Sequence, residues 1–152
     1  MNGFAALRLG AISRAVLCAS ALFAATASGH AQDGEAPDCE NQDTQMVMTY
    51  CAGLDYETAD AELNDIWPEM LAYARTRDED VAPMARDRGV PTTLEAMKSA
   101  QRAWIAYRDA ECEFEAYEVF GGSAQPMVGS ACLARLTNER IELFRSILDA
   151  DR

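Results

Sequence analysis

Few side chains in this sequence could carry out catalysis, and their spacing favours binding over reaction. The only histidine is His30, so the commonest general base is missing from the rest of the chain, together with any Ser-His or Cys-His pair. The sole lysine, Lys98, is followed by Ser99. Neighbours on a helix project about 100° apart, so these two side chains cannot act as a pair.

Two carboxylates offer a catalytic alternative. Glu111 and Glu115 are four residues apart and therefore share a helix face, where two acids could serve as acid and base in glycoside cleavage. That reaction also needs a sugar-sized cleft, which three packed helices seldom provide. The acidic run at 78–80 lacks the ligand spacing of a calcium-binding loop. We therefore expect no enzyme activity, no catalytic residue, no cofactor and no metal site.

The N-terminal residues have the features of a signal peptide. Arg8 and Arg14 are basic, residues 15–27 are apolar, and small residues follow. Cleavage is expected after Ala31, with Ala27 as the alternative. The apolar run is shorter than the ~20 residues of a spanning helix. We predict that residues 1–31 are the signal peptide and that residues 32–152 form one domain, exported to the periplasm or outside the cell, with no membrane span after processing.

Four cysteines remain after this processing. An even number in an exported chain indicates two disulfides rather than a metal site. Three connectivities are possible. We favour Cys39 with Cys51 and Cys112 with Cys132, because each pair closes a short loop near an expected helix end.

The processed chain is strongly acidic. Residues 32–152 hold 25 acidic and 11 basic side chains, which gives a formal charge of −14. Such a charge disfavours nucleic acid and anionic membrane as partners, and it steers a cationic partner toward the protein.

Apolar spacing predicts an all-α fold, an antiparallel bundle of three long helices braced by disulfides. The helices are expected at about 44–75, with a kink at Pro68, at about 92–120 and at about 130–149. Residues 76–91 are predicted to be a connector, and residues 121–129 an uncharged loop. The residues expected to be buried are Met46, Tyr50, Leu54, Ala59, Leu63, Trp67, Met70 and Ala74 on the first helix; Leu94, Met97, Trp104, Ile105, Cys112, Phe114, Tyr117 and Phe120 on the second; and Leu133, Leu136, Ile141, Leu143, Phe144, Ile147 and Leu148 on the third.

One aromatic face of the second helix carries an arginine. Trp104, Tyr107, Arg108 and Glu111 follow three- and four-residue steps toward Cys112, so they share or adjoin one face. A partly buried guanidinium needs a carboxylate partner, and the candidates are Glu111, Asp60 and Glu62. We interpret Arg108 as part of an ion pair that fixes the register of two helices, in preference to a ligand-binding residue.

These motifs resemble a known family. Gln101, Arg102, Trp104, Tyr107, Arg108, Asp109 and Cys112, together with the preceding segments CENQDTQMVMTYC and DAELND, resemble the LprI-like lysozyme-inhibitor family over about residues 38–148. The resemblance implies an exported protein that binds a lysozyme, and a basic lysozyme would suit the acidic chain.

Two further functions stay open at this point, a non-inhibitory structural or interaction module of the cell envelope and a carboxylate-dependent hydrolase. For the inhibitor, the uncharged loop is the candidate partner surface, with Ser123, Gln125 and Met127 as its residues.

Overall fold

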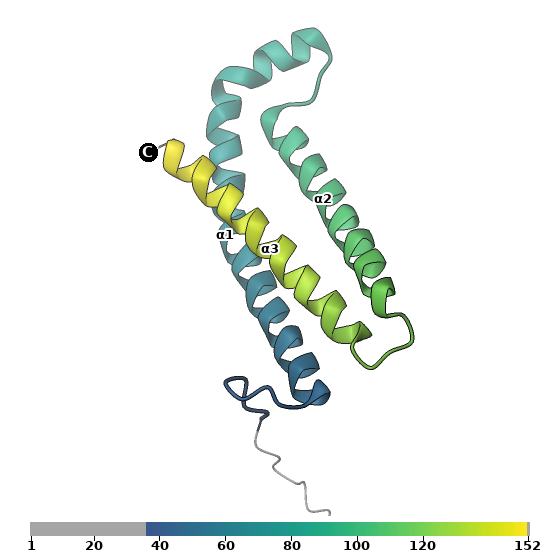
Figure 1. Ribbon diagram of the computed structural model, residues 1–152. Coiled ribbons are helices and arrows are strands. Elements are labelled where there is room, and N and C mark those ends of the chain that lie inside the picture. Colours follow the sequence, from purple (N-terminus) through teal and green to yellow (C-terminus); the bar gives the residue numbers. More distant parts are fainter. Residues whose placement is uncertain (1–35, 152) are drawn as a thin grey trace, which may run out of the picture. The chain divides into compact units, whose positions relative to one another are not determined.

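The computed structural model describes residues 36–151, which form three long helices and one short 3-10 helix. They are α1 (Gln45–Arg88), α2 (Thr93–Ala116), η1 (Tyr117–Val119) and α3 (Gln125–Ala150). Within this range no residue is in a β-strand. Consecutive helices run in opposite directions, and α3 crosses α1 (Figure 1). The all-α, three-helix prediction is confirmed. No helix in residues 36–151 is long and apolar enough to cross a membrane.

The main core lies between α1 and α3, the two helices with the most extensive contact. Leu63 and Met70 from α1 pack against Ile141 and Phe144 from α3. The Trp67 ring stacks on Phe144 with 6.0 Å between ring centroids. Because α1 carries its apolar residues at helical spacing on both sides of Pro68, the helix continues through that proline.

The connector predicted at 76–91 is wrong, because α1 continues to Arg88. Arginine, glutamate, alanine and methionine are good helix formers, and this part of the helix is largely exposed, so it shows no apolar stripe. Gly89 ends the helix with a φ of 65°, and its N–H bonds the Arg86 carbonyl. The last part of α1 bends toward the start of α2 (Figure 1), as expected of a helix that contains Pro83.

A capping box begins α2. The Thr92 side chain accepts from the Glu95 N–H, and the Glu95 carboxylate accepts from the Thr92 N–H. Asp78 of α1 adds a second contact, since its carboxylate accepts from the N–H groups of Thr93 at 2.7 Å and Leu94 at 3.0 Å. The bent end of α1 therefore holds the first turn of α2.

The loop between the second and third helices is shorter than predicted. The expected start of the third helix near Ser130 is wrong, because α3 begins at Gln125. Pro126 stands in the first turn, where a helix does not need the N–H that proline lacks. Gly121, with a φ of 76°, donates its N–H to the Gln125 side chain at 2.8 Å and so closes the turn.

Several residues predicted to be buried lie on the surface, and these predictions are wrong. They are Met46, Tyr50 and Leu54 on α1; Ile105, Phe114, Tyr117 and Phe120 on or just after α2; and Leu143 on α3. Both α1 and α2 make most of their contacts with α3, so each of these two helices buries one face and leaves the other exposed. Apolar spacing alone does not say which of two faces that is.

Candidate functional site

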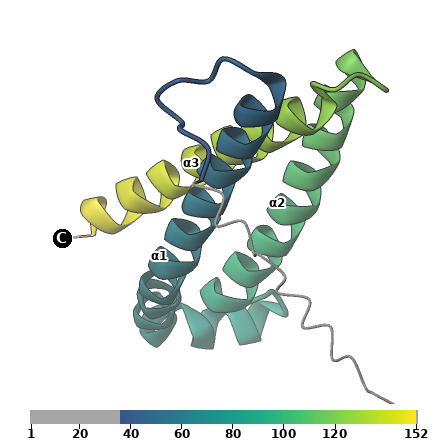
Figure 2. The same ribbon diagram turned by 90° about the horizontal axis from the view of Figure 1, so that it is seen from below.

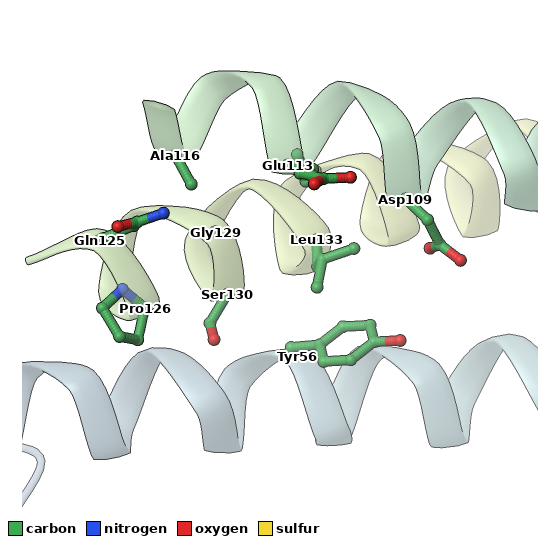
Figure 3. A pocket seen from close by; sticks show the side chains of 10 residues that line it. Tyr56, Asp109, Glu113, Ala116, Gln125, Pro126, Gly129, Ser130 and Leu133 are labelled. Carbon is green, nitrogen blue, oxygen red and sulfur yellow. The ribbon is translucent and has the colours of Figure 1, made fainter. Parts of the chain in front are cut away.

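A groove of about 650 Å³ lies where the three helices meet near the C-terminal end of α2. Tyr56 of α1 forms one side, Asp109 and Glu113 of α2 stand on the other, and the first turns of α3 form the floor (Figure 3). The remaining lining residues are Cys112, Ala116, Gln125, Pro126, Gly129, Ser130 and Leu133. The groove is mainly apolar, with acidic and aromatic groups at its edges.

Arg108 joins the three helices directly beside this groove. Its side chain donates to Asp60 of α1 at 3.2 Å, to Asp109 of its own helix at 2.9 Å, and to the Thr137 hydroxyl of α3 at 3.2 Å. The residue is 6% exposed and Thr137 is 0% exposed. Because Asp109 also lines the groove, Arg108 fixes one of the groove's two carboxylates in place.

Aromatic rings complete the surroundings of the guanidinium. Its carbon lies 5.3 Å from the Tyr56 ring centroid and 5.2 Å from that of Trp104, within cation–π range. Burial raises the pKa of Tyr56, and nearby Arg108 opposes that shift. Burial alone would lower the pKa of Arg108, but Asp109, Tyr56 and Asp60 outweigh it and raise that pKa. Both side chains therefore keep their ordinary charge at neutral pH, Tyr56 neutral and Arg108 positive.

The structure separates the four residues of the predicted aromatic face. Trp104 is partly buried against the main core and lies between Arg108 and Arg140. Tyr107 projects to the surface. Glu111 is half-buried, and no ion pair joins it to Arg108 in the described residues. Of the three carboxylates expected as partners, Asp60 pairs with Arg108, whereas Glu62 pairs with Arg145.

Sequence reasoning missed Tyr56 and Thr137. Tyr56 precedes Asp60 by four residues and so shares its helix face, a spacing that could have suggested a common site. Thr137 gave no signal, because a single threonine within an apolar helix has many ordinary roles.

Two disulfides brace the same end of the bundle, in the pairing that the loop lengths favoured. Cys39 is bonded to Cys51, which ties the segment before α1 back onto that helix. Cys112 is bonded to Cys132, which ties the end of α2 to the start of α3. Cys112 lines the groove, so the second disulfide is also part of its wall.

The three residues of the predicted partner loop do not share a loop. Ser123 is exposed between η1 and α3, whereas Gln125 and Met127 belong to the first turn of α3. Gln125 lines the groove and caps Gly121. Met127 accepts a hydrogen bond from Gln45 at 3.4 Å, which joins α3 to α1. Of these three residues, only Ser123 lies in the segment that connects η1 to α3.

The described residues considered as catalytic candidates do not line the groove. His30 lies outside the described residues, and Lys98 is on the opposite half of α2. Glu111 and Glu115 do not line the groove, and Glu115 is paired with Arg135 at 2.8 Å. The described residues include no cluster of three or more histidine, cysteine or acidic side chains placed to hold a metal ion.

Negative charge is concentrated around the groove. Residues 36–74 contain nine acidic side chains, residues 109–134 contain five, and neither stretch contains lysine or arginine. The first belongs mainly to α1, and the second covers the end of α2, η1 and the start of α3. The lower part of α1 lies together with the end of α2, η1 and the start of α3 at the lower end in Figure 1, and we call this end the acidic half. Residues 75–108 hold seven basic side chains.

Fold and groove together define a small disulfide-braced helical protein with a groove that is mainly apolar and has acidic groups at its edges. Comparison with known proteins agrees. The sequence pattern of the family described as "Lysozyme inhibitor LprI" matches residues 37–143. The chain belongs to this LprI lysozyme-inhibitor family.

A relative in Rhizobium meliloti (strain 1021), described only as an uncharacterized protein, is 40% identical over 131 residues, covering 86% of this chain and 92% of the relative. No solved structure matches the chain.

Proposed function

We propose that this protein inhibits lysozyme by binding it through the acidic half, with the groove as the centre of the contact. The observation that carries the proposal is the composition of the two stretches that contribute to the groove, residues 36–74 and 109–134, which hold 14 acidic side chains and no lysine or arginine. Family membership supplies the class of partner. A basic lysozyme complements this surface, and long-range attraction would speed its association.

The groove suits a basic side chain of the enzyme. An arginine or lysine inserted there would have the Tyr56 ring on one side and the Asp109 carboxylate on the other (Figure 3). A cation between an aromatic face and a carboxylate gains cation–π and ion-pair interactions together. The stem of such a side chain would pack on the apolar floor.

We further propose that the chain acts after export, in the periplasm or outside the cell, as residues 32–152 cleaved from a signal peptide. Supporting this are the apolar N-terminal segment after Arg8 and Arg14 and the two disulfides, which persist in oxidising compartments.

The test is a lysis assay. Purified protein at equimolar ratio should slow the clearing of cell walls by a basic lysozyme, and more strongly at low salt than at high salt. Reversing two exposed acids of the acidic half, Asp55→Lys with Glu57→Lys, should weaken inhibition about tenfold at low salt. The matched control is Asp80→Lys with Asp87→Lys, the same charge change on the other end of α1, where inhibition should change much less.

A second variant separates groove binding from general attraction. Ser130→Trp fills the groove without changing the charge, and we expect it to abolish inhibition while the chain stays folded. If the lysis rate is the same with and without the protein for several basic lysozymes, the proposal is wrong. If both charge-reversed pairs weaken inhibition equally, the acidic half is not the docking surface.

A further inference from the structure

The outer face of α2 carries an apolar stripe that no described part of the chain covers. Its residues recur at alternating steps of three and four, the spacing of a coiled-coil seam. They are Ala100, Ala103, Tyr107, Ala110, Phe114 and Tyr117, and all are exposed. We call them the α2 stripe. Figures 1 and 2 show α1 and α3 on one side of α2 and the other side open.

The stripe is large for a surface that stays in water. Tyr107 is 54% exposed, Phe114 72% and Tyr117 53%, and Phe120, 69% exposed, stacks on Tyr117 at 5.0 Å between ring centroids. A buried aromatic side chain covers about 150–250 Å², so these four leave on the order of 500 Å² of aromatic surface in water. That equals the largest patch on a typical monomer. With the alanines and flanking residues it approaches the roughly 800 Å² that each partner contributes to a stable complex.

We infer that the α2 stripe pairs with the α2 stripe of a second copy of this chain, in an antiparallel two-fold arrangement. The first reason is shape. The N-terminal half of the stripe holds two alanines and one ring, and the C-terminal half holds one alanine and two rings. An antiparallel copy places small residues against large ones in successive layers. Ala100 meets the partner's Tyr117, Ala103 meets the partner's Phe114, and Tyr107 meets the partner's Ala110.

A parallel pair lacks this complementarity. It would set Phe114 and Tyr117 against the partner's copies of the same rings, while the alanines faced one another across a gap.

The second reason is charge. Arg102 and Glu113 are about three helical turns apart, so both project from the same side of α2. In the antiparallel register, Arg102 lies within about 3 Å along the axis of the partner's Glu113. Neither side chain has an ion-pair partner among the described residues. The same arrangement places the acidic half of one copy beside residues 75–108 of the other, which hold seven basic side chains. A parallel pair would instead bring the two acidic halves together.

Analytical ultracentrifugation of the protein purified after expression of the full chain tests the inference. We expect a species with twice the mass of one chain, in equilibrium with the monomer. Phe114→Glu should raise the dissociation constant of this dimer at least about 30-fold, because it places a charge within the apolar seam, opposite the partner's Ala103. The matched control is Met46→Glu. Met46 is 73% exposed on α1, and its substitution should leave the dissociation constant unchanged.

A charge exchange tests the orientation. Arg102→Glu alone and Glu113→Arg alone should each weaken the dimer several-fold, and the double variant should restore it, because each exchanged side chain then meets its opposite on the partner.

Three results would overturn the inference. The first is a monomer at every concentration up to about 1 mM. The second is an equal effect of Phe114→Glu and Met46→Glu on the dimer. The third is a Phe114→Glu variant that leaves the mass unchanged and abolishes lysozyme inhibition, which would assign the α2 stripe to the enzyme. The first two results are measured by mass without lysozyme, so they test the dimer even if the protein does not inhibit lysozyme.

Discussion

Arg108 shows how one buried cation can hold three helices in register. Its guanidinium is planar and donates in fixed directions, so it can serve Asp60, Asp109 and Thr137 at once while its faces contact Tyr56 and Trp104. A lysine could not do this, because an ammonium group is compact and has no flat face. The interaction is worth more than a surface ion pair, since Arg108 itself is almost fully buried.

We predict that Arg108→Met lowers the free energy of unfolding by about 2 to 3 kcal/mol. Removing one partner of a buried ion pair costs 3–5 kcal/mol when the other is left unsolvated. The loss is smaller here because the side chains of Asp60 and Asp109 stay 40% and 56% exposed and can be hydrated. Urea denaturation measures the change.

The matched control for this prediction is Lys98→Met, which removes an exposed cation from the same helix. Its free energy of unfolding should change by no more than about 0.5 kcal/mol. Equal effects of the two substitutions would mean that Arg108 does not stabilise the register of the helices.

At the scale of elements, Asp78 joins the bent end of α1 to the start of α2. Its carboxylate accepts two backbone N–H groups from the first turn of α2, where the helix dipole also favours negative charge. Burial alone would raise the pKa of Asp78, but the hydrogen bonds from Leu94 and Thr93 outweigh it and hold that pKa below its ordinary value.

We predict that Asp78→Asn lowers the melting temperature at neutral pH. Because the pKa of Asp78 is lowered in the folded state, its stabilisation is complete above the unfolded-state pKa. It is lost as pH falls through the lower folded-state pKa. The difference in melting temperature between the protein and the variant should therefore be constant above about pH 5 and shrink below about pH 4.

Thermal melts monitored by circular dichroism across that range check the Asp78 prediction. Asp80→Asn, an exposed position on the same helix, is the control and should melt like the unaltered protein. A difference for Asp78→Asn that persists unchanged into strong acid would contradict the assigned role.

The sequence predicted those parts of the fold that are set by residues close together in the chain. The start of the second helix near residue 92 and the apolar spacing at Leu63 and Met70 depend on neighbours in the chain, and both appear in the structure. The extension of α1 to Arg88 could not be predicted, because its contact with α2 joins Asp78 to Thr93 and Leu94 across a turn. A charged, proline-containing segment has the same sequence pattern whether it forms an exposed helix or a loop.

The candidate site was predicted only in part, for a similar reason. The spacing around Arg108 indicated a buried arginine, and Asp60 was among the expected partners. The groove itself depends on how α1, α2 and α3 cross, which the sequence pattern does not contain. Phe114 and Tyr117 were assigned to the core, because α2 has two apolar faces and periodicity cannot tell which one packs inside the chain.

At the scale of the whole molecule, negative charge and disulfides are both concentrated at one end of the bundle. Both disulfides lie in the acidic half, where the helices carry the most negative charge and therefore repel one another. The main apolar core lies further along α1, around Leu63 and Met70. Covalent bonds thus hold together the end of the bundle where electrostatics oppose packing.

We predict that the two disulfides have similar effects on stability and different effects on inhibition. They close loops with sequence separations of 12 and 20 residues, so removing either should lower the free energy of unfolding by about 3 kcal/mol. Replacing Cys112 and Cys132 with serine should also weaken lysozyme inhibition, because Cys112 is part of the groove wall. Replacing Cys39 and Cys51 should leave inhibition nearly unchanged at temperatures where the chain stays folded.

Melting curves and lysis assays on the two double-serine variants measure these effects side by side. The Cys39 and Cys51 variant is the control, because it removes a disulfide of similar strength away from the groove. The assignment of the groove would be contradicted if both variants inhibited equally well. It would also be contradicted if the Cys39 and Cys51 variant alone lost inhibition, since the segment before α1 would then be the docking surface. Retained inhibition in that variant, with loss in the other, would place the functional surface on α2 and α3.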